Sequence, residues 1–284
     1  MPNPFFHHLM AKVALFMLLL SAIGLPLTKL TLDWPKVIPK VIVLMLLALL
    51  GWFYHWRKEE KLRDTLLCSG WFILLSNLYI LPMYMAARRD VGLGDDLLAQ
   101  LDGMLGLNAV TIAQFTKAHP TVESISMIVY LSLGLLMLLA VMVPPLRGEA
   151  KYTEGFAVSV LAAAVLSIPI LLVFQAMGPW YLHQLPPDEL QLQFKETFFL
   201  LKKDEWFLIN FQNPPGLMTF PSFHVILSVL SAWALRTVPY LRWGVGVLAI
   251  LICFTTLTTG WHYVIDILGG LLISALCIGA ERRY

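Results

Sequence analysis

Two polar turns each place a histidine at the point where a long apolar run begins. The first turn is TFPSFH at residues 219–224, and the second is TGWHYVID at residues 259–266. In the second turn, His262 and Asp266 are spaced i, i+4, so on a helix they share one face within side-chain reach. A carboxylate that orients an imidazole, with a second imidazole such as His224 nearby, is suited to nucleophilic and general acid chemistry.

The first turn has the pattern of a capped helix start. Pro221 and Ser222 directly precede the apolar run, and Ser is a favoured N-cap residue. The free amides of a first helical turn and the positive end of the helix dipole make an anion site. His224 would then lie beside a phosphate bound to those amides. The alternative is that Pro-Ser only caps a helix and that His224 is an interfacial histidine.

The second turn carries a carboxylate with no other evident task. Gly260 permits a tight turn, and Asp266 lies between Ile265 and Ile267. Ionisable residues at membrane depth are costly and usually serve a function. As the partner of an imidazole N–H, Asp266 would hold one tautomer of His262 and raise the basicity of its other nitrogen. The alternative is a buried His-Asp pair that joins two helices. These residues alone leave open which histidine is the nucleophile.

The composition is that of an integral membrane protein. The 284 residues are 58% hydrophobic and 13% charged, against about 25% charged in soluble domains. We expect an all-α polytopic bundle of about eight transmembrane helices, because apolar runs near bilayer-spanning length recur along the chain. The expected spans are residues 9–28, 37–56, 65–86, 123–143, 155–178, 222–238, 241–258 and 262–280.

Charge and cysteine content exclude several other classes. A net charge of +2 without a basic, aromatic-interleaved stripe argues against a nucleic-acid partner. The three cysteines lie inside apolar runs without metal-ligand or disulfide spacing. No histidine pair has the spacing of a metal site, so we expect neither a metal nor another cofactor.

Two long links are expected to form interfacial helices on the outer face. Short loops rich in Lys and Arg follow the second, fourth and sixth spans, which the positive-inside rule makes cytoplasmic. Both histidine turns then face the non-cytoplasmic side of the membrane, the inner membrane in a bacterium. In the link 88–121, apolar residues at helical spacing predict an amphipathic helix. They are Leu97, Leu98, Leu101, Met104 and Leu105. The link 179–221 is rich in aromatic residues, which concentrate at headgroup depth and suit a lipid substrate.

The two turns resemble the type 2 phosphatidic acid phosphatase superfamily. The resemblance rests on PSFH at residues 221–224 and GWHYVIDILGG at residues 260–270, and more loosely on residues 95–107. It is closest to the branch of inositol phosphorylceramide synthases and their bacterial homologues. It implies a six-helix catalytic core, here residues 65–284, with residues 1–64 as two additional N-terminal transmembrane helices.

The resemblance also implies roles for individual residues. His262 would attack phosphorus and form a phosphohistidine, Asp266 would orient it, and His224 would protonate the departing oxygen. Ser222 and the Phe223 amide would help to hold the phosphate of a lipid phosphate or phospholipid.

The chain departs from the phosphatase pattern in its cations. The family's Ser-Arg pair is replaced by Thr255-Thr256, and its upstream Lys…Arg-Pro motif is not evident. Cations normally stabilise a phosphoryl group in transfer. Lys202 and Lys203 are the first candidates to bind phosphate instead, and Arg88-Arg89 come next. Solvated or headgroup-facing side chains are the alternative for each.

The sequence is compatible with three kinds of function, the first of which is an enzyme that acts on the phosphoester of a lipid. With water as acceptor, the protein is a lipid phosphatase; with an alcohol such as inositol, a sugar or a lipid, it is a phosphotransferase, and the missing Arg favours this branch. A lipid transporter or scramblase is less favoured, because the polar residues gather at helix ends and not at the membrane midplane. A non-catalytic family member is the third.

Overall fold

The computed structural model describes residues 4–106, 108–212 and 214–281. The elements in chain order are α1 (Pro4–Leu27), β1 (Leu30–Leu32), α2 (Trp34–Trp56), α3 (Glu60–Ala87), α4 (Asp95–Met104), α5 (Ala109–Ala118), α6 (Pro120–Leu131), α7 (Leu133–Leu146), α8 (Lys151–Val173), α9 (Pro179–Leu182), α10 (Glu189–Leu201), β2 (Phe207–Ile209), α11 (Phe223–Ala234), α12 (Arg242–Thr258) and α13 (Val264–Glu281).

The predicted all-α polytopic membrane fold is confirmed. Within the described ranges, six helical segments are long and apolar enough to cross a bilayer: α1, α2, α3, the continuous run α6–α7, α8 and α13. The predicted spans 222–238 and 241–258 are apolar but shorter, because α11 ends at Ala234 and α12 begins only at Arg242. All eight predicted spans are therefore helical, and six reach spanning length.

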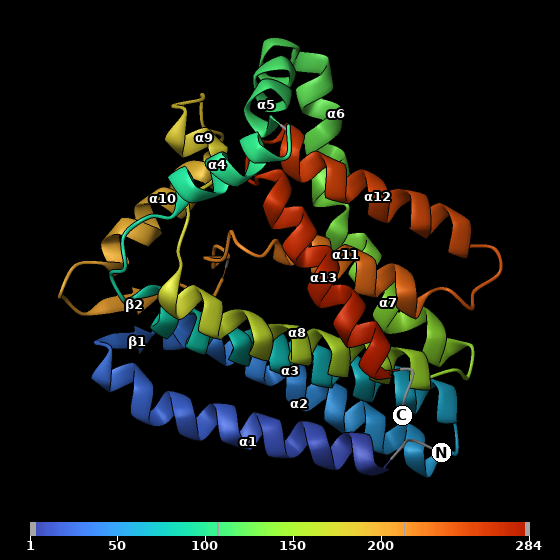
Figure 1. Cartoon of the computed structure of the whole chain (residues 1–284). Coiled ribbons are helices and arrows are strands. Elements are labelled where there is room, and N and C mark those ends of the chain that lie inside the picture. Colours follow the sequence, from blue (N-terminus) through green and yellow to red (C-terminus); the bar gives the residue numbers. More distant parts are fainter. Residues whose placement is uncertain (1–3, 107, 213, 282–284) are drawn as a thin grey trace.

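The helices form two connected groups around α3 and α11. Figure 1 shows α1, α2, α3 and α8 running alongside one another, and α3 contacts the other three. Helix α11 contacts α7, α8, α12 and α13. The links from α2 to α3, from α7 to α8 and from α11 to α12 lie at one end of the bundle (Figure 1). These three short links, which carry Arg57, Arg147 and Arg236, therefore share one end, whereas the basic residues of the two long links lie elsewhere.

The two long links form several short helices and a strand. The link 88–121 forms two helices, α4 and α5, in place of the single predicted helix. On α4, Leu97 and Met104 are exposed while Leu98 is buried. The outward apolar face of this helix agrees with a place at the interface. The link 179–221 contributes α9, α10 and β2.

A parallel two-stranded pairing joins the N-terminal helices to the link 179–221. Leu30, Thr31 and Leu32 of β1 pair with Phe207, Leu208 and Ile209 of β2. This pairing cannot be predicted from the sequence, because strands of three residues between helices have no detectable period-2 pattern. The expected division of the chain at residue 64 stays a prediction.

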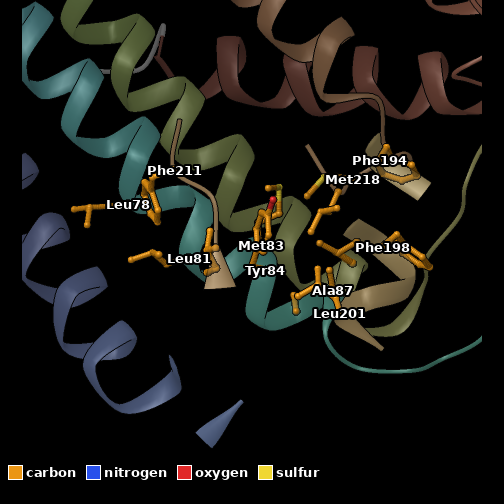
Figure 2. Close-up of a cluster of buried hydrophobic side chains, with 14 of the residues drawn as sticks. Leu78, Leu81, Met83, Tyr84, Ala87, Phe194, Phe198, Leu201, Phe211 and Met218 are labelled. Atoms are coloured by element: carbon orange, nitrogen blue, oxygen red, sulfur yellow. The ribbon is translucent and has the colours of Figure 1, made fainter. Parts of the chain in front are cut away.

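A buried apolar cluster packs the last turns of α3 against α10 and the segment after β2. Figure 2 shows Met83, Tyr84 and Ala87 of α3 near Phe198 and Leu201 of α10. These side chains are nearly inaccessible to solvent. The cluster therefore holds the link 179–221 on the end of the long membrane helices.

Helices α11 and α13 are fastened to each other at both ends. At one end, the Ser222 amide donates to the Asp266 carbonyl oxygen over 3.1 Å. At the other end, Trp233 Nε1 donates to Glu281 over 2.8 Å. Between them the helices approach so closely that a Cβ at Gly270 would lie 2.8 Å from the Ser222 carbonyl oxygen. Gly270 is therefore required for the contact that brings the two histidine turns together.

Candidate active site

The two histidines lie side by side, although 38 positions separate them in the chain. The ring centroids of His224 and His262 are 6.4 Å apart, with the ring planes inclined at 54°. This proximity follows from the contact of α11 with α13, since each histidine lies within two residues of a helix start. The expectation that the two turns meet is confirmed.

Asp266 holds the His262 ring from a fully buried position. Its Oδ2 lies 3.2 Å from His262 Nδ1 and accepts a hydrogen bond from the Tyr263 amide over 2.9 Å. Gly260, at φ +79°, turns the chain just before His262. With Nδ1–H donated to the carboxylate, the lone pair of His262 is on Nε2, the nitrogen farther from Asp266.

Ser222 is the N-cap of α11, as predicted. Its Oγ accepts from the Val225 amide over 3.4 Å. The amides of Phe223 and His224 belong to the first helical turn, where the helix itself supplies no acceptor. Phe223 and His224 line the cavity described below, whereas Ser222 is buried behind it. The first turn of α11 therefore lies at the wall of the cavity that holds the histidine pair.

Tyr130 is a site residue that sequence reasoning missed. Its ring stacks on His224 with centroids 4.4 Å apart, and its hydroxyl lies 3.5 Å from His224 Nδ1. The residue belongs to α6, which the sequence shows only as an apolar run. The only sign of a site residue in this part of the sequence is one tyrosine among aliphatic residues. Its contact with His224 fixes the plane of that ring.

Two buried carboxylates of α4 hold the start of α13. Asp102 accepts from the amides of Val264 and Ile265, each over 2.9 Å. Asp95 accepts from the Tyr263 hydroxyl over 3.2 Å, and also from the amides of residues 177 and 178. Burial raises the pKa of Asp95, and its two backbone hydrogen bonds counteract that shift. The segment that was expected to lie on the membrane surface therefore positions the three residues that directly follow His262.

An apolar cavity of about 620 Å³ opens onto the histidine pair. Both imidazoles, Tyr130 and Trp261 line it together with aliphatic and aromatic side chains of α3, α8 and α10. Among the lining residues in the described part of the chain there is no Lys or Arg. The cavity therefore combines one polar end with walls that suit a hydrocarbon chain.

The predicted phosphate-binding lysines lie elsewhere. Lys202 and Lys203 line a second hollow with Arg88 and Arg89, and neither lysine is among the residues around the histidine cavity. Thr256 is fully buried and donates its hydroxyl to the Cys253 carbonyl oxygen over 2.7 Å. This threonine cannot replace the charge of an arginine. Burial lowers the pKa of Lys202 to about 8.

The comparison with known proteins agrees with the motifs. The sequence profile described as the PAP2 superfamily, the type 2 phosphatidic acid phosphatases, matches residues 96–280, from α4 to the last turn of α13. Curated proteins and solved structures give no significant match. The profile covers both histidine turns and Asp266, which the structure brings together at one end of an apolar cavity. The chain therefore belongs to the PAP2 superfamily.

Proposed function

We propose that the protein cleaves a phosphoester of a lipid headgroup through a phosphohistidine intermediate on His262. The observation that carries the proposal is the His224–His262 pair, with rings 6.4 Å apart at the polar end of the apolar cavity. A separation of this size leaves room for one phosphorus centre between the rings. Membership of a superfamily that acts on phosphoesters supports the same reaction class.

The first step forms the covalent intermediate. Nε2 of His262 attacks phosphorus, and the bond from phosphorus to the departing oxygen breaks. His224 donates a proton to that oxygen as general acid, so the product leaves as an alcohol. Asp266 keeps the Nδ1 proton of His262 in place and stabilises the charge that the ring acquires.

The second step releases the phosphoryl or phosphodiester group. His224, now neutral, takes a proton from water or an alcohol, whose oxygen attacks phosphorus as the phosphorus–nitrogen bond breaks. Water gives a phosphatase, and an alcohol such as inositol, a sugar or a lipid gives a phosphotransferase. Both reactions restore the starting protonation state of the two histidines.

Neutral donors would stabilise the phosphate oxygens in this site. Phe223 and His224 line the cavity, and their amides belong to a first helical turn, which can bind an anion. Tyr79 and Trp261 also line the cavity, and among the described residues their buried hydroxyl and indole N–H have no hydrogen-bond partner. Without a lining Lys or Arg, a singly charged phosphodiester is easier to desolvate than a doubly charged monoester. This argument favours the transferase reaction.

We also propose that the site faces the non-cytoplasmic side. The basic connections, with Arg57, Arg147 and Arg236, lie at the other end of the bundle (Figure 1). Short basic loops are retained in the cytoplasm. The interfacial helix α4, whose carboxylates hold the start of α13, would then lie at the outer headgroup layer.

A product analysis tests the proposal. The purified full-length protein is incubated separately with phosphatidic acid, a polyprenyl diphosphate, and phosphatidylinositol plus a lipid alcohol. Free phosphate and new lipid are then measured. We expect turnover in at least one arm, abolished by His262→Ala and retained in His119→Ala, since His119 is exposed on the link between α5 and α6. Turnover that survives His262→Ala would contradict the proposal.

A further inference from the structure

A second, polar hollow lies where the ends of α1, α3 and α10 meet. Its volume is about 300 Å³. The residues around it are mostly cationic, with five Lys or Arg and a single acidic residue among those that the structure describes. They are Leu27, Thr28, Lys29, Met85, Arg88, Arg89, Lys202, Lys203 and Asp204. We call this site the basic hollow.

Lys202 joins the segments that surround the basic hollow. Its ammonium group donates to the carbonyl oxygens of Ala87 over 2.6 Å and Arg89 over 2.7 Å, and also to the side-chain oxygen of Gln175. These bonds tie the end of α10 to the end of α3 and to the chain after α8. Hydrogen bonds between three segments of the chain therefore hold the hollow in its shape.

The other cations keep unused donors. Arg88 donates one nitrogen to the Glu205 carbonyl oxygen, and its other terminal nitrogen is buried without a partner among the described residues. Lys29 forms an ion pair with the exposed Asp204 over 2.6 Å. Arg89 and Lys203 are exposed. A buried guanidinium N–H without an acceptor is costly, so this arrangement calls for an anionic acceptor.

The basic hollow does not belong to the histidine cavity. Met83 of α3 lines the cavity, whereas Met85 of α3 and Arg88, just after this helix, line the hollow. Figure 2 shows the apolar packing at this place, where Ala87 of α3 lies near Phe198 and Leu201 of α10. The cations of the hollow are therefore directed away from the histidines.

Exposed apolar side chains lie beside the basic hollow. Leu27, which lines it, is 78% exposed at the end of the membrane helix α1, and Trp206 is 64% exposed just before β2. Exposed aromatic residues next to cations at the end of a membrane helix are typical of headgroup depth. The geometry points to the phosphate of an anionic phospholipid as the ligand of the basic hollow, at a site distinct from the histidine cavity.

Native mass spectrometry of the full-length protein with dioleoyl phosphatidylglycerol tests this inference. Separate arms use dioleoyl phosphatidylcholine and inorganic phosphate. The test variant is Arg89→Gln/Lys203→Gln, because both side chains are exposed and hold no other element. The matched control, Arg57→Gln/Lys195→Gln, removes two exposed charges outside the hollow. Each Lys or Arg near a membrane surface strengthens anionic lipid binding about fivefold.

We expect the wild type and the control to bind phosphatidylglycerol about equally, and both more tightly than phosphatidylcholine. The test variant should bind phosphatidylglycerol about 25-fold more weakly, whereas Arg89→Lys/Lys203→Arg should retain binding. Equal weakening in test and control variants would overturn the inference. So would equal affinity for the two lipids, or saturation by inorganic phosphate at the concentrations where phosphatidylglycerol saturates.

Discussion

Replacing Asp102 by Asn tests whether α4 positions the catalytic residues. Asp102 is 3% exposed and accepts the amides of Val264 and Ile265. An Asn side chain offers one acceptor oxygen and turns an NH₂ group toward the second amide. The substitution therefore leaves one amide without an acceptor and removes a negative charge from the N-terminal end of α13.

The expected loss in the free energy of unfolding follows from the lost hydrogen bond and the lost negative charge. A hydrogen bond to a charged group contributes about 1.5–3 kcal/mol, and a carboxylate at a partly buried helix N-terminus contributes up to about 2 kcal/mol. Asp102→Asn should therefore lower the free energy of unfolding by about 2–5 kcal/mol. His262 lies two residues before α13, and a misplacement of about 1 Å can reduce kcat about 100-fold.

Thermal unfolding and lipid turnover of the purified protein measure the two effects. For a chain of this size, the loss should lower Tm by at least about 4 °C. The matched control is Asp96→Asn, since Asp96 is an exposed carboxylate on the first turn of the same helix. Asp102→Asn should lose both stability and turnover while Asp96→Asn loses neither. Equal values for the two variants would refute the positioning role of Asp102.

Three further predictions concern the imidazoles and the basic hollow. Asp266→Asn should reduce kcat on the order of 10⁴-fold, because the carboxylate no longer sets the His262 tautomer; a loss below about tenfold would contradict the role. His224→Ala should slow alkyl phosphoesters more than 4-nitrophenyl esters in a rate comparison, since a good leaving group needs no general acid; equal losses would contradict that role. Anion binding to the basic hollow should weaken as pH rises through about 8, because burial lowers the pKa of Lys202 to about 8 and only the protonated amine attracts anions. Binding measured at pH 7 and pH 9 should show this decline in the wild type and not in Lys202→Arg, and a flat wild-type profile would refute it. The other charged groups around Lys202 are Lys29, Arg88, Arg89, Asp90, Lys203 and Asp204.

The membrane fold and the meeting of the histidine turns could be predicted from the sequence. Apolar runs directly predict the membrane helices. The i, i+4 spacing of His262 and Asp266 predicts their contact, which forms with Asp266 in the first turn of α13. The spacing of seven residues between Asp95 and Asp102 also places them on one helix face. That spacing was a usable signal for the α4 contacts, but it does not show which helix the carboxylates hold.

The positions of Lys202 and Tyr130 could not be predicted in the same way. Lys202 was expected near a phosphate because of its place in the chain, yet its ammonium group binds carbonyl oxygens at the end of α3. Which neighbour a lysine meets depends on how α10 packs against α3, a long-range contact without a local pattern. Tyr130 meets His224 through a contact between residues 94 positions apart, which likewise has no local pattern.

Trapping the covalent intermediate tests the central claim most directly. The full-length protein is mixed with a lipid substrate labelled with ³²P at the reacting phosphorus, quenched in alkali to preserve phosphohistidine, and digested for peptide mapping. The label should lie on His262 in the peptide containing residues 259–266 and disappear in His262→Ala. Label on another residue, or turnover with no label on the protein at any quench time, would contradict nucleophilic attack by His262.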